Sequence, residues 1–420
     1  MFYSARFFFI TVCLVILSLS SVAWGETLTI EGAVSQALGE NPQLKAKESM
    51  LDAAKARIGI ARSLEDPMIG VEFYDVPINT TDIKQGMETN YSIIQKIPFP
   101  SKLITQGTVA KKMYEAEKSS YEMGRIDIIV QTEHAFHELY FLERSFKINQ
   151  ELQGLFRKLV ASEEGRYTTG DKTSQDFLKA KVELDKLQSE AALLEAKKIQ
   201  AKAMLNILRH RNPGEEINLA ELPRHDHPFP SYEEFEKKVL EGHPELKAAQ
   251  SSVEAQKANL SLARQQAVLP DIQARFTYAQ RPNLIDAWTA EGMINIPFFW
   301  GKNRKVIKEA QAMKKVAENE LLNVQNERLA TIKETYARFE SSKKSYDLFR
   351  GKVLSHATLA LKSSEATYET GKEDFLSLID SARGFKEAKL GTLEAFVEYH
   401  KAITHLKLAV GEDFMNEWMK

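Results

Sequence analysis

The sequence predicts a mainly α-helical protein built as a duplicated unit of helix, strand, strand, helix and helix, with a small β part. The first indication is a six-residue motif that occurs twice, as NPQLKA at residues 41–46 and as HPELKA at 243–248. The second is that each copy is followed by the same features in the same order. These are a helical segment, two alternating runs, an Ile-Pro-Phe step and a Tyr-x-x-Gly turn. The repeat is far too long for a solenoid, so we interpret the chain as two homologous halves of one architecture.

Composition excludes several classes of function. The formal net charge is -2 and no basic block stands out, so nucleic acid is not an expected partner. Charged residues make up 27% of the chain, which favours long solvated helices. The single cysteine, Cys13, lies in the apolar N-terminal stretch, so the remaining chain has no thiol for a disulfide, a thiolate metal site or catalysis.

Residues 1–25 have the layout of a secretory signal peptide, with a retained anchor as the alternative. Arg6 precedes an apolar run at 7–19, and Ala23-Trp24-Gly25 forms a small-x-small cleavage site. The residues before Cys13 make a poor lipidation site, so we predict no lipid anchor. Beyond residue 25 no stretch approaches the roughly 20 apolar residues that a membrane helix needs.

The first structural repeat is predicted over 26–209, and it begins with a helix that is kinked or broken at Pro42. Thr29 is the expected N-cap, and Asp66-Pro67 ends the segment. A proline-free stretch from about residue 101 to 167 predicts one very long helix or a pair of stacked helices, which indicates a coiled-coil projection rather than a compact core. The tip of this helical hairpin is predicted at 167–171, where Gly170 takes the left-handed position.

Four runs of about nine residues alternate between apolar and polar side chains. They form two predicted β-hairpins, at 68–97 and 270–297. A membrane-spanning β-strand needs roughly 9–11 residues with one apolar face, and these runs fit. An ordinary half-buried sheet is the alternative. Four strands cannot close a barrel, so a barrel would have to be shared by several chains.

The return helix of each hairpin carries a regular row of small or apolar residues. A row of small residues allows helices to pack closely side by side, although a generic helical bundle would show a similar pattern. The two rows are Ala180, Leu187, Leu194, Ala201 and Leu208, and then Ser381, Ala388, Ala395, Ala402 and Ala409.

A polar linker at 210–230 separates the two halves. The second structural repeat is predicted over 231–411, with its helical hairpin tip at 368–372 around Gly371, and a C-terminal tail follows at 412–420. The long helix of this half is predicted to run from Arg304 to Tyr368.

In this order, the duplicated motifs resemble those of outer-membrane efflux proteins of the TolC family. The resemblance covers nearly all of the chain beyond residue 25. It is closest to the branch associated with heavy-metal resistance, because residues 97–102 read IPFPSK and Gly165-Arg166-Tyr167 precedes the first turn. It implies a homotrimer in which each chain gives four strands to a twelve-stranded barrel in the outer membrane. The long helices would form a periplasmic α-helical tunnel.

The resemblance also implies roles for particular residues. Tyr167, Gly170, Tyr368 and Gly371 would form the tips where a periplasmic adaptor (membrane fusion) protein docks. Asp176 and Tyr368 would hydrogen-bond between neighbouring helices to keep the aperture shut, and Asp380 would belong to a carboxylate ring. Three copies of Asp380 near a constriction would favour cations, whereas solvated helix surface is the alternative.

Two positions depart from the family pattern. Glu373 stands where a basic gate residue is expected, and Ser377 replaces the first aspartate of the aperture. The family's closing network therefore need not be the one that this chain uses.

No enzymatic or cofactor motif is present, so we predict a protein that is not an enzyme and has no cofactor. His134 and His137 have helical spacing suitable for a metal, and His225 and His227 lie close together in the linker. We interpret the first pair as a surface face of the long helix and the second as a polar loop, so no metal site is predicted.

Two classes of function remain. The first is a passive exit duct for metal cations or drugs, served by an adaptor and an inner-membrane pump of the resistance-nodulation-division type or similar. Protein secretion of type I is a variant of this class. The second is a structural periplasmic coiled-coil protein without a pore. The alternating strands favour the channel, because a structural coiled coil has no need of four membrane-length strands.

Overall fold

A computed structural model describes residues 27–168, 174–223, 229–282 and 284–411. These residues form two compact units. Unit 1 holds 27–41, the described residues of 131–228, and 343–401, and unit 2 holds 42–130, 229–342 and the chain from 402. Each unit contains segments from both sequence repeats, because the long helices of both repeats contribute to both units. The predicted signal peptide and the tail at 412–420 lie outside the described residues.

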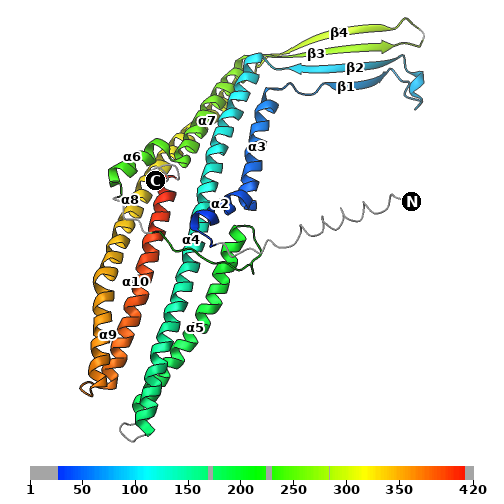
Figure 1. The fold of residues 1–420 in the computed structure, drawn as a ribbon. Helices are drawn as coiled ribbons and strands as arrows, with labels where there is room; N and C mark the ends of the chain where they lie inside the picture. The colour runs from blue at the N-terminus through cyan, green and yellow to red at the C-terminus, as the bar shows by residue number, and fades with distance from the viewer. Residues whose placement is uncertain (1–26, 169–173, 224–228, 283, 412–420) are drawn as a thin grey trace, which may run out of the picture. The chain divides into compact units, whose positions relative to one another are not determined.

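Unit 2 contains one antiparallel sheet of four strands in the order β1-β2-β3-β4 (Figure 1). The strands are β1 (Met68–Tyr74), β2 (Glu88–Ile97), β3 (Asp271–Gln280) and β4 (Ala287–Asn295). Each predicted hairpin is present, and the β2–β3 pairing joins the two hairpins into one sheet. Strands from both repeats therefore share one hydrogen-bonded surface.

The sheet has one apolar face and one polar face. On the apolar face, two rows cross all four strands: Ile69, Ile93, Phe276 and Ala290, and then Val71, Tyr91, Tyr278 and Trp288. On the other face, Gly70, Ser92, Thr277 and Thr289 form a row. The apolar rows are exposed to a large degree, with Ile69 at 81% and Trp288 at 69%. The alternation predicted from the sequence is thus in register across the whole sheet.

Long helices account for most of the remaining chain. Unit 2 holds α3 (Pro42–Arg62), α6 (Tyr232–Gly242) and α7 (Pro244–Val268), together with most of α8 (Trp300–Leu348). Unit 1 holds α2 (Ile30–Glu40), α5 (Ser174–Leu208) and α9 (Leu354–Glu369). Like α8, whose last residues belong to unit 1, the helices α4 (Pro100–Thr168) and α10 (Phe375–Val410) contribute to both units. None of the described helices is both long and apolar enough to cross a membrane.

The junction between sheet and helices in unit 2 is held by a buried lysine. Lys102 lies in the first turn of α4 and is 5% exposed. Its Nζ lies 2.8 Å from Asp271 Oδ1 at the start of β3 and 2.8 Å from the Leu269 carbonyl. The Phe99 N–H also donates to Asp271, at 3.3 Å. These bonds connect the helix of the first repeat to the strand of the second.

The duplicated motif has the same structural role in both repeats. The Asn41 side chain donates to the Leu208 carbonyl at 3.0 Å, at the end of α5. The His243 Nε2 lies 3.4 Å from the Leu408 carbonyl, near the end of α10. Each residue precedes a proline that starts a helix, and each satisfies a carbonyl that a helix end leaves free. The motif therefore ties the start of one helix to the end of another.

The long helix of the second repeat has one feature that the sequence did not predict. The long helix of the second repeat is interrupted by a π-helical turn, η3 (Phe349–Val353), between α8 and α9. The Phe349 ring lies against Gly391 of α10, where an added Cβ would meet it at 2.6 Å. An extra residue in one turn has no periodic signature, so the sequence pattern did not reveal it.

Candidate aperture at the helical hairpin turns

The turn between α9 and α10 closes on a glycine. Gly371 has a φ of 71°, which glycine adopts without a steric penalty. Its N–H donates to the Tyr368 carbonyl at 3.0 Å, and the Lys372 N–H donates to the Thr367 carbonyl at 3.0 Å. These bonds satisfy the last carbonyls of α9. Tyr167 falls in the last turn of α4, and Gly170 lies outside the described residues.

Tyr368 links the two helical hairpins of unit 1. Its hydroxyl donates to the carboxylate of Glu163 on α4. Tyr368 is 4% exposed and Glu163 is 1% exposed. A buried carboxylate needs such a donor, because an unsatisfied charged group in the interior is costly. Sequence analysis did not identify Glu163 as a partner of Tyr368, because a single glutamate on a long charged helix has no distinguishing pattern.

An apolar cluster surrounds this hydrogen bond. The Tyr368 ring lies 5.6 Å from the ring of Phe375, measured between centroids. The cluster draws on α4, α5, α9 and α10, and its fully buried members include Phe375, Leu378, Ile379, Ala382 and Ala180. The two hairpins of one chain therefore share a core close to the turns.

The two departures from the family pattern have local partners within the same turn. Glu373 accepts hydrogen bonds from Ser364, at 3.0 Å, and from Thr367. Asp374 precedes α10 and accepts the Ser377 N–H at 3.0 Å and the Ser377 hydroxyl at 2.5 Å. This is N-capping of a helix. Glu373 and Ser377 thus stabilise the turn itself.

Asp380 and Asp176 occupy different environments. Asp380 is exposed on α10, and its carboxylate lies 3.3 Å from Arg383. Arg383 also binds Glu183 of α5, at 2.6 Å, and this hydrogen bond lowers the pKa of Glu183. The guanidinium therefore bridges Asp380 to the neighbouring hairpin. Asp176 lies half-buried in the first turn of α5, where a negative charge interacts favourably with the helix dipole.

The interpretation of the histidines on α4 is wrong for one of them. His137 is 1% exposed, and its ring lies 5.7 Å from that of His400 on α10. The adjacent Glu133 is also buried. This face of α4 is therefore packed inside unit 1 rather than solvated. Among the residues that the structure describes, no group of three or more metal-binding side chains is present. His225 and His227 lie outside the described residues.

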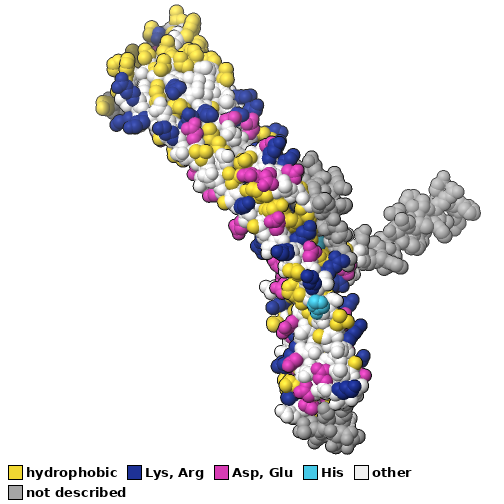
Figure 2. Space-filling view, turned by 90° about the vertical axis from the view of Figure 1, so that its left-hand side faces the viewer, with side chains coloured by type: hydrophobic (Ala, Val, Ile, Leu, Met, Phe, Trp, Pro, Cys, Tyr) yellow, Lys and Arg dark blue, Asp and Glu magenta, His cyan; other side chains and the backbone are white. Residues whose placement is uncertain are grey.

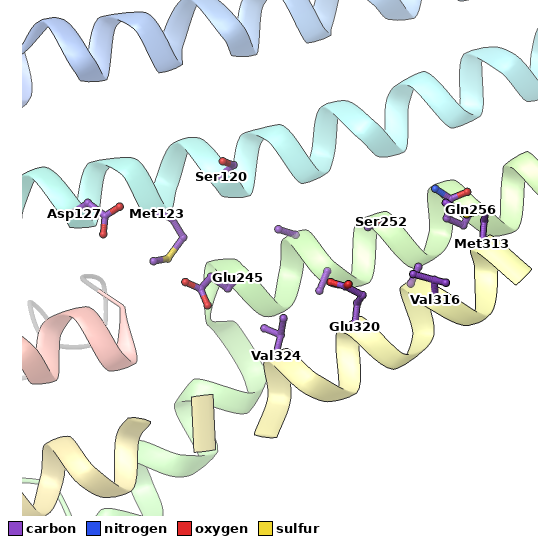
Figure 3. A pocket seen from close by; sticks show the side chains of 13 residues that line it. Ser120, Met123, Asp127, Glu245, Ser252, Gln256, Met313, Val316, Glu320 and Val324 are labelled. Carbon is purple, nitrogen blue, oxygen red and sulfur yellow. The ribbon is translucent and has the colours of Figure 1, made fainter. Parts of the chain in front are cut away.

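A groove of about 620 Å³ lies in unit 2 between α4, α7 and α8 (Figure 3). Three carboxylates line it, Asp127, Glu245 and Glu320, one from each helix. Burial raises the pKa of Asp127, while Glu245 lies 3.2 Å from Arg328. The rest of the lining is mostly small or apolar. The carboxylates are spread along the groove, so it does not have the form of a compact cation site.

The family model described as "Outer membrane efflux protein" matches residues 33–208 and again 237–412. Each match covers most of one repeat, and the two together cover most of the chain. The chain therefore belongs to the outer membrane efflux protein family, whose members are channels rather than enzymes. No curated protein matches the sequence.

Solved structures show the same fold. The outer-membrane channel OprN superposes with a TM-score of 0.78 at 17% identity, over 92% of this chain and 90% of that chain. CusC superposes with a TM-score of 0.77 at 16% identity, over 92% of this chain and 93% of that chain. The CmeC outer membrane channel of Campylobacter jejuni gives 0.76 at 15% identity, covering 93% and 89%. The prediction of a mainly helical chain with four strands is confirmed.

Proposed function

We propose that this protein is the outer-membrane exit duct of a tripartite efflux system. Three copies assemble, and their twelve strands close a barrel in the outer membrane. The long helices extend into the periplasm as a tunnel with a gated end. Export is passive, and the energy comes from an inner-membrane pump of the resistance-nodulation-division type or similar.

The observation that carries the proposal is the pair of apolar rows across all four strands. Both rows lie on one face and are largely exposed, with Val71 at 53% and Phe276 at 47%. An outward-facing apolar band opposite a polar face is the pattern of membrane barrel strands. Burying these rows in lipid removes their contact with water.

The turns support a gate in the same proposal. The buried Tyr368–Glu163 hydrogen bond holds α9 to α4, and Arg383 holds α10 to α5. Both contacts must change if the hairpins separate. We propose that Tyr167, Gly170, Tyr368 and Gly371 form the docking tips for a periplasmic adaptor protein, and that Asp176 contributes to the closed state.

Metal cations or drugs are the proposed substrates. The resemblance of residues 97–102 and of Gly165-Arg166-Tyr167 to the branch associated with heavy-metal resistance supports metal cations. The two alternatives are less well supported. A structural coiled-coil protein would not need an exposed apolar face on its sheet. No observation favours protein secretion over efflux.

Single-channel recording in planar bilayers tests the proposal. The wild type is compared with Asp380→Ala, and Glu394→Ala serves as a matched control because Glu394 is another exposed carboxylate on α10. We expect discrete conductance steps with a preference for cations, weakened by Asp380→Ala and kept by Glu394→Ala. Unchanged selectivity in Asp380→Ala would remove that residue from the constriction. A protein without any conductance would exclude the channel.

A further inference from the structure

We propose that residues 298–305 anchor the protein in the headgroup layer of the membrane and bind anionic phospholipids there. These residues are called the 298–305 surface below. The segment connects the end of β4 to the first turns of α8. This inference rests on the proposed function, which places β3 and β4 in a bilayer.

Three consecutive aromatic side chains in this segment are exposed. Phe298 is 74% exposed, Phe299 77% and Trp300 69%. Adjacent large rings exposed to this degree indicate an interaction site rather than ordinary protein surface. Figure 2 shows hydrophobic side chains gathered where the sheet lies, with Lys and Arg side chains close by.

Cations follow the aromatic residues directly. Lys302, Arg304 and Lys305 are all exposed, and none of them has an ion pair with another described residue. They lie in the first turns of α8, where positive charge is opposed by the helix dipole. These three cations therefore do not stabilise the helix that carries them. A negatively charged partner outside the protein would explain their position.

The equivalent residues of the first repeat are less exposed. Phe99 is 39% exposed, about half as much as Phe298. Lys102, the counterpart of Lys302, is buried against Asp271. The duplicated fold can therefore hold this lysine inside the protein. An exposed aromatic and basic segment is a property of the second repeat alone, so the fold does not require it.

A phospholipid surface fits this chemistry. The exposed side chains of Ile294 and Ile296 lead from β4 directly to the aromatic residues. Aromatic side chains are favoured at the boundary between hydrocarbon and water, and Lys and Arg near the surface attract anionic headgroups. In the sequence the order is apolar strand, aromatic residues, then cations, which matches the order of layers in a bilayer.

Tryptophan quenching by brominated lipids tests the position of the segment. The full chain has four tryptophans, and two variants keep either Trp300 or Trp288 by changing the other three to Phe. Trp288 lies on the apolar face of β4 and reports whether the sheet enters the bilayer. Both variants are reconstituted in phosphatidylcholine vesicles with bromines at shallow or deep positions. We expect Trp300 to be quenched more strongly by shallow bromines.

Lipid preference tests the role of the cations. Quenching of Trp300 by brominated phosphatidylglycerol is compared with quenching by brominated phosphatidylcholine at low salt. We expect a roughly two- to fivefold preference for the anionic lipid. The triple variant Lys302→Gln, Arg304→Gln and Lys305→Gln should abolish this preference. A matched control changes three exposed lysines elsewhere in unit 2 and should keep it: Lys111→Gln, Lys257→Gln and Lys315→Gln.

Each other outcome overturns the proposal. If Trp288 is quenched by lipid but Trp300 is not, the segment faces water or a second copy of the chain, and the proposed channel survives. If the control triple variant also loses the preference for anionic lipid, that preference comes from the overall charge of the protein. If neither tryptophan is quenched and no conductance appears, the proposed function fails together with the 298–305 surface.

Discussion

The hydroxyl of Tyr368 on α9 donates a hydrogen bond to the carboxylate of Glu163 on α4, and both side chains are buried. The bond joins residues 205 positions apart in the sequence. It lies inside the apolar cluster that the two hairpins share, so separating the hairpins breaks it.

We predict that Tyr368→Phe loosens the closed aperture. The change keeps the ring packed on Phe375 but leaves the Glu163 carboxylate without its donor, at a cost of about 1–3 kcal/mol. The variant should spend more time in its high-conductance state in planar bilayers. Tyr346→Phe is the matched control, because the Tyr346 ring packs in the same unit and its hydroxyl has no hydrogen bond to another described residue. Gating identical to the wild type in Tyr368→Phe would contradict the role of this bond.

Removing Arg383 should act in the opposite direction to removing Asp380. Arg383 lies 3.3 Å from Asp380, so it offsets part of the negative charge at that position. Arg383→Ala should therefore increase the preference for cations, whereas Asp380→Ala should decrease it. Reversal potentials in a potassium chloride gradient measure both. Lys362→Ala, which removes an exposed cation from α9, should change neither. Equal shifts in Arg383→Ala and Lys362→Ala would indicate a general charge effect.

Stability should fall as the pH drops from about 6.5 to about 4, in part because of His243. Burial lowers the pKa of His243 to about 4 from 6.5. The unfolded chain therefore binds a proton in this window that the folded chain does not, which costs at most about 3 kcal/mol. In the folded state Nδ1 accepts the Glu245 N–H, at 3.3 Å, so this nitrogen is not free to take a proton.

The variant His243→Asn isolates that contribution, since Asn41 occupies the equivalent position of the first repeat. Thermal unfolding of the detergent-solubilised protein is followed at several pH values. The difference in stability between wild type and variant should shrink or reverse in favour of the variant as the pH falls through the window. A constant difference would show that His243 keeps the same proton in both states.

Lys102→Met should destabilise the junction between sheet and helices. The change leaves Asp271 partly buried without its cation and the Leu269 carbonyl without a donor, at a cost of about 2–4 kcal/mol. Lys302→Met is the matched control from the second repeat, and its exposed position predicts a change within about 0.5 kcal/mol in detergent. Denaturant unfolding in micelles compares the two. Equal effects would show that the buried ion pair contributes nothing specific.

Much of the local structure was determined by the sequence alone. The alternation of residues 68–97 and 270–297 predicted the strands, and Gly371 marked the second turn, where the structure shows a left-handed backbone. The rows of small residues on the return helices are indeed mostly buried, including Ala180, Ala388 and Ala402. These features depend on periodicity and on the conformational freedom of single residues, both of which can be recognised within a short window.

The tertiary structure decided which distant residues become partners. In the folded chain β2 pairs with β3, which joins the two β-hairpins. Tyr368 bonds to Glu163, and Arg383 bonds to Glu183. Folding also buries His137, which helical spacing alone had assigned to the surface. Long charged helices offer many equivalent carboxylates along their length. Which of them meets a given tyrosine or arginine depends on how helices from distant parts of the chain align, and no local pattern records that alignment.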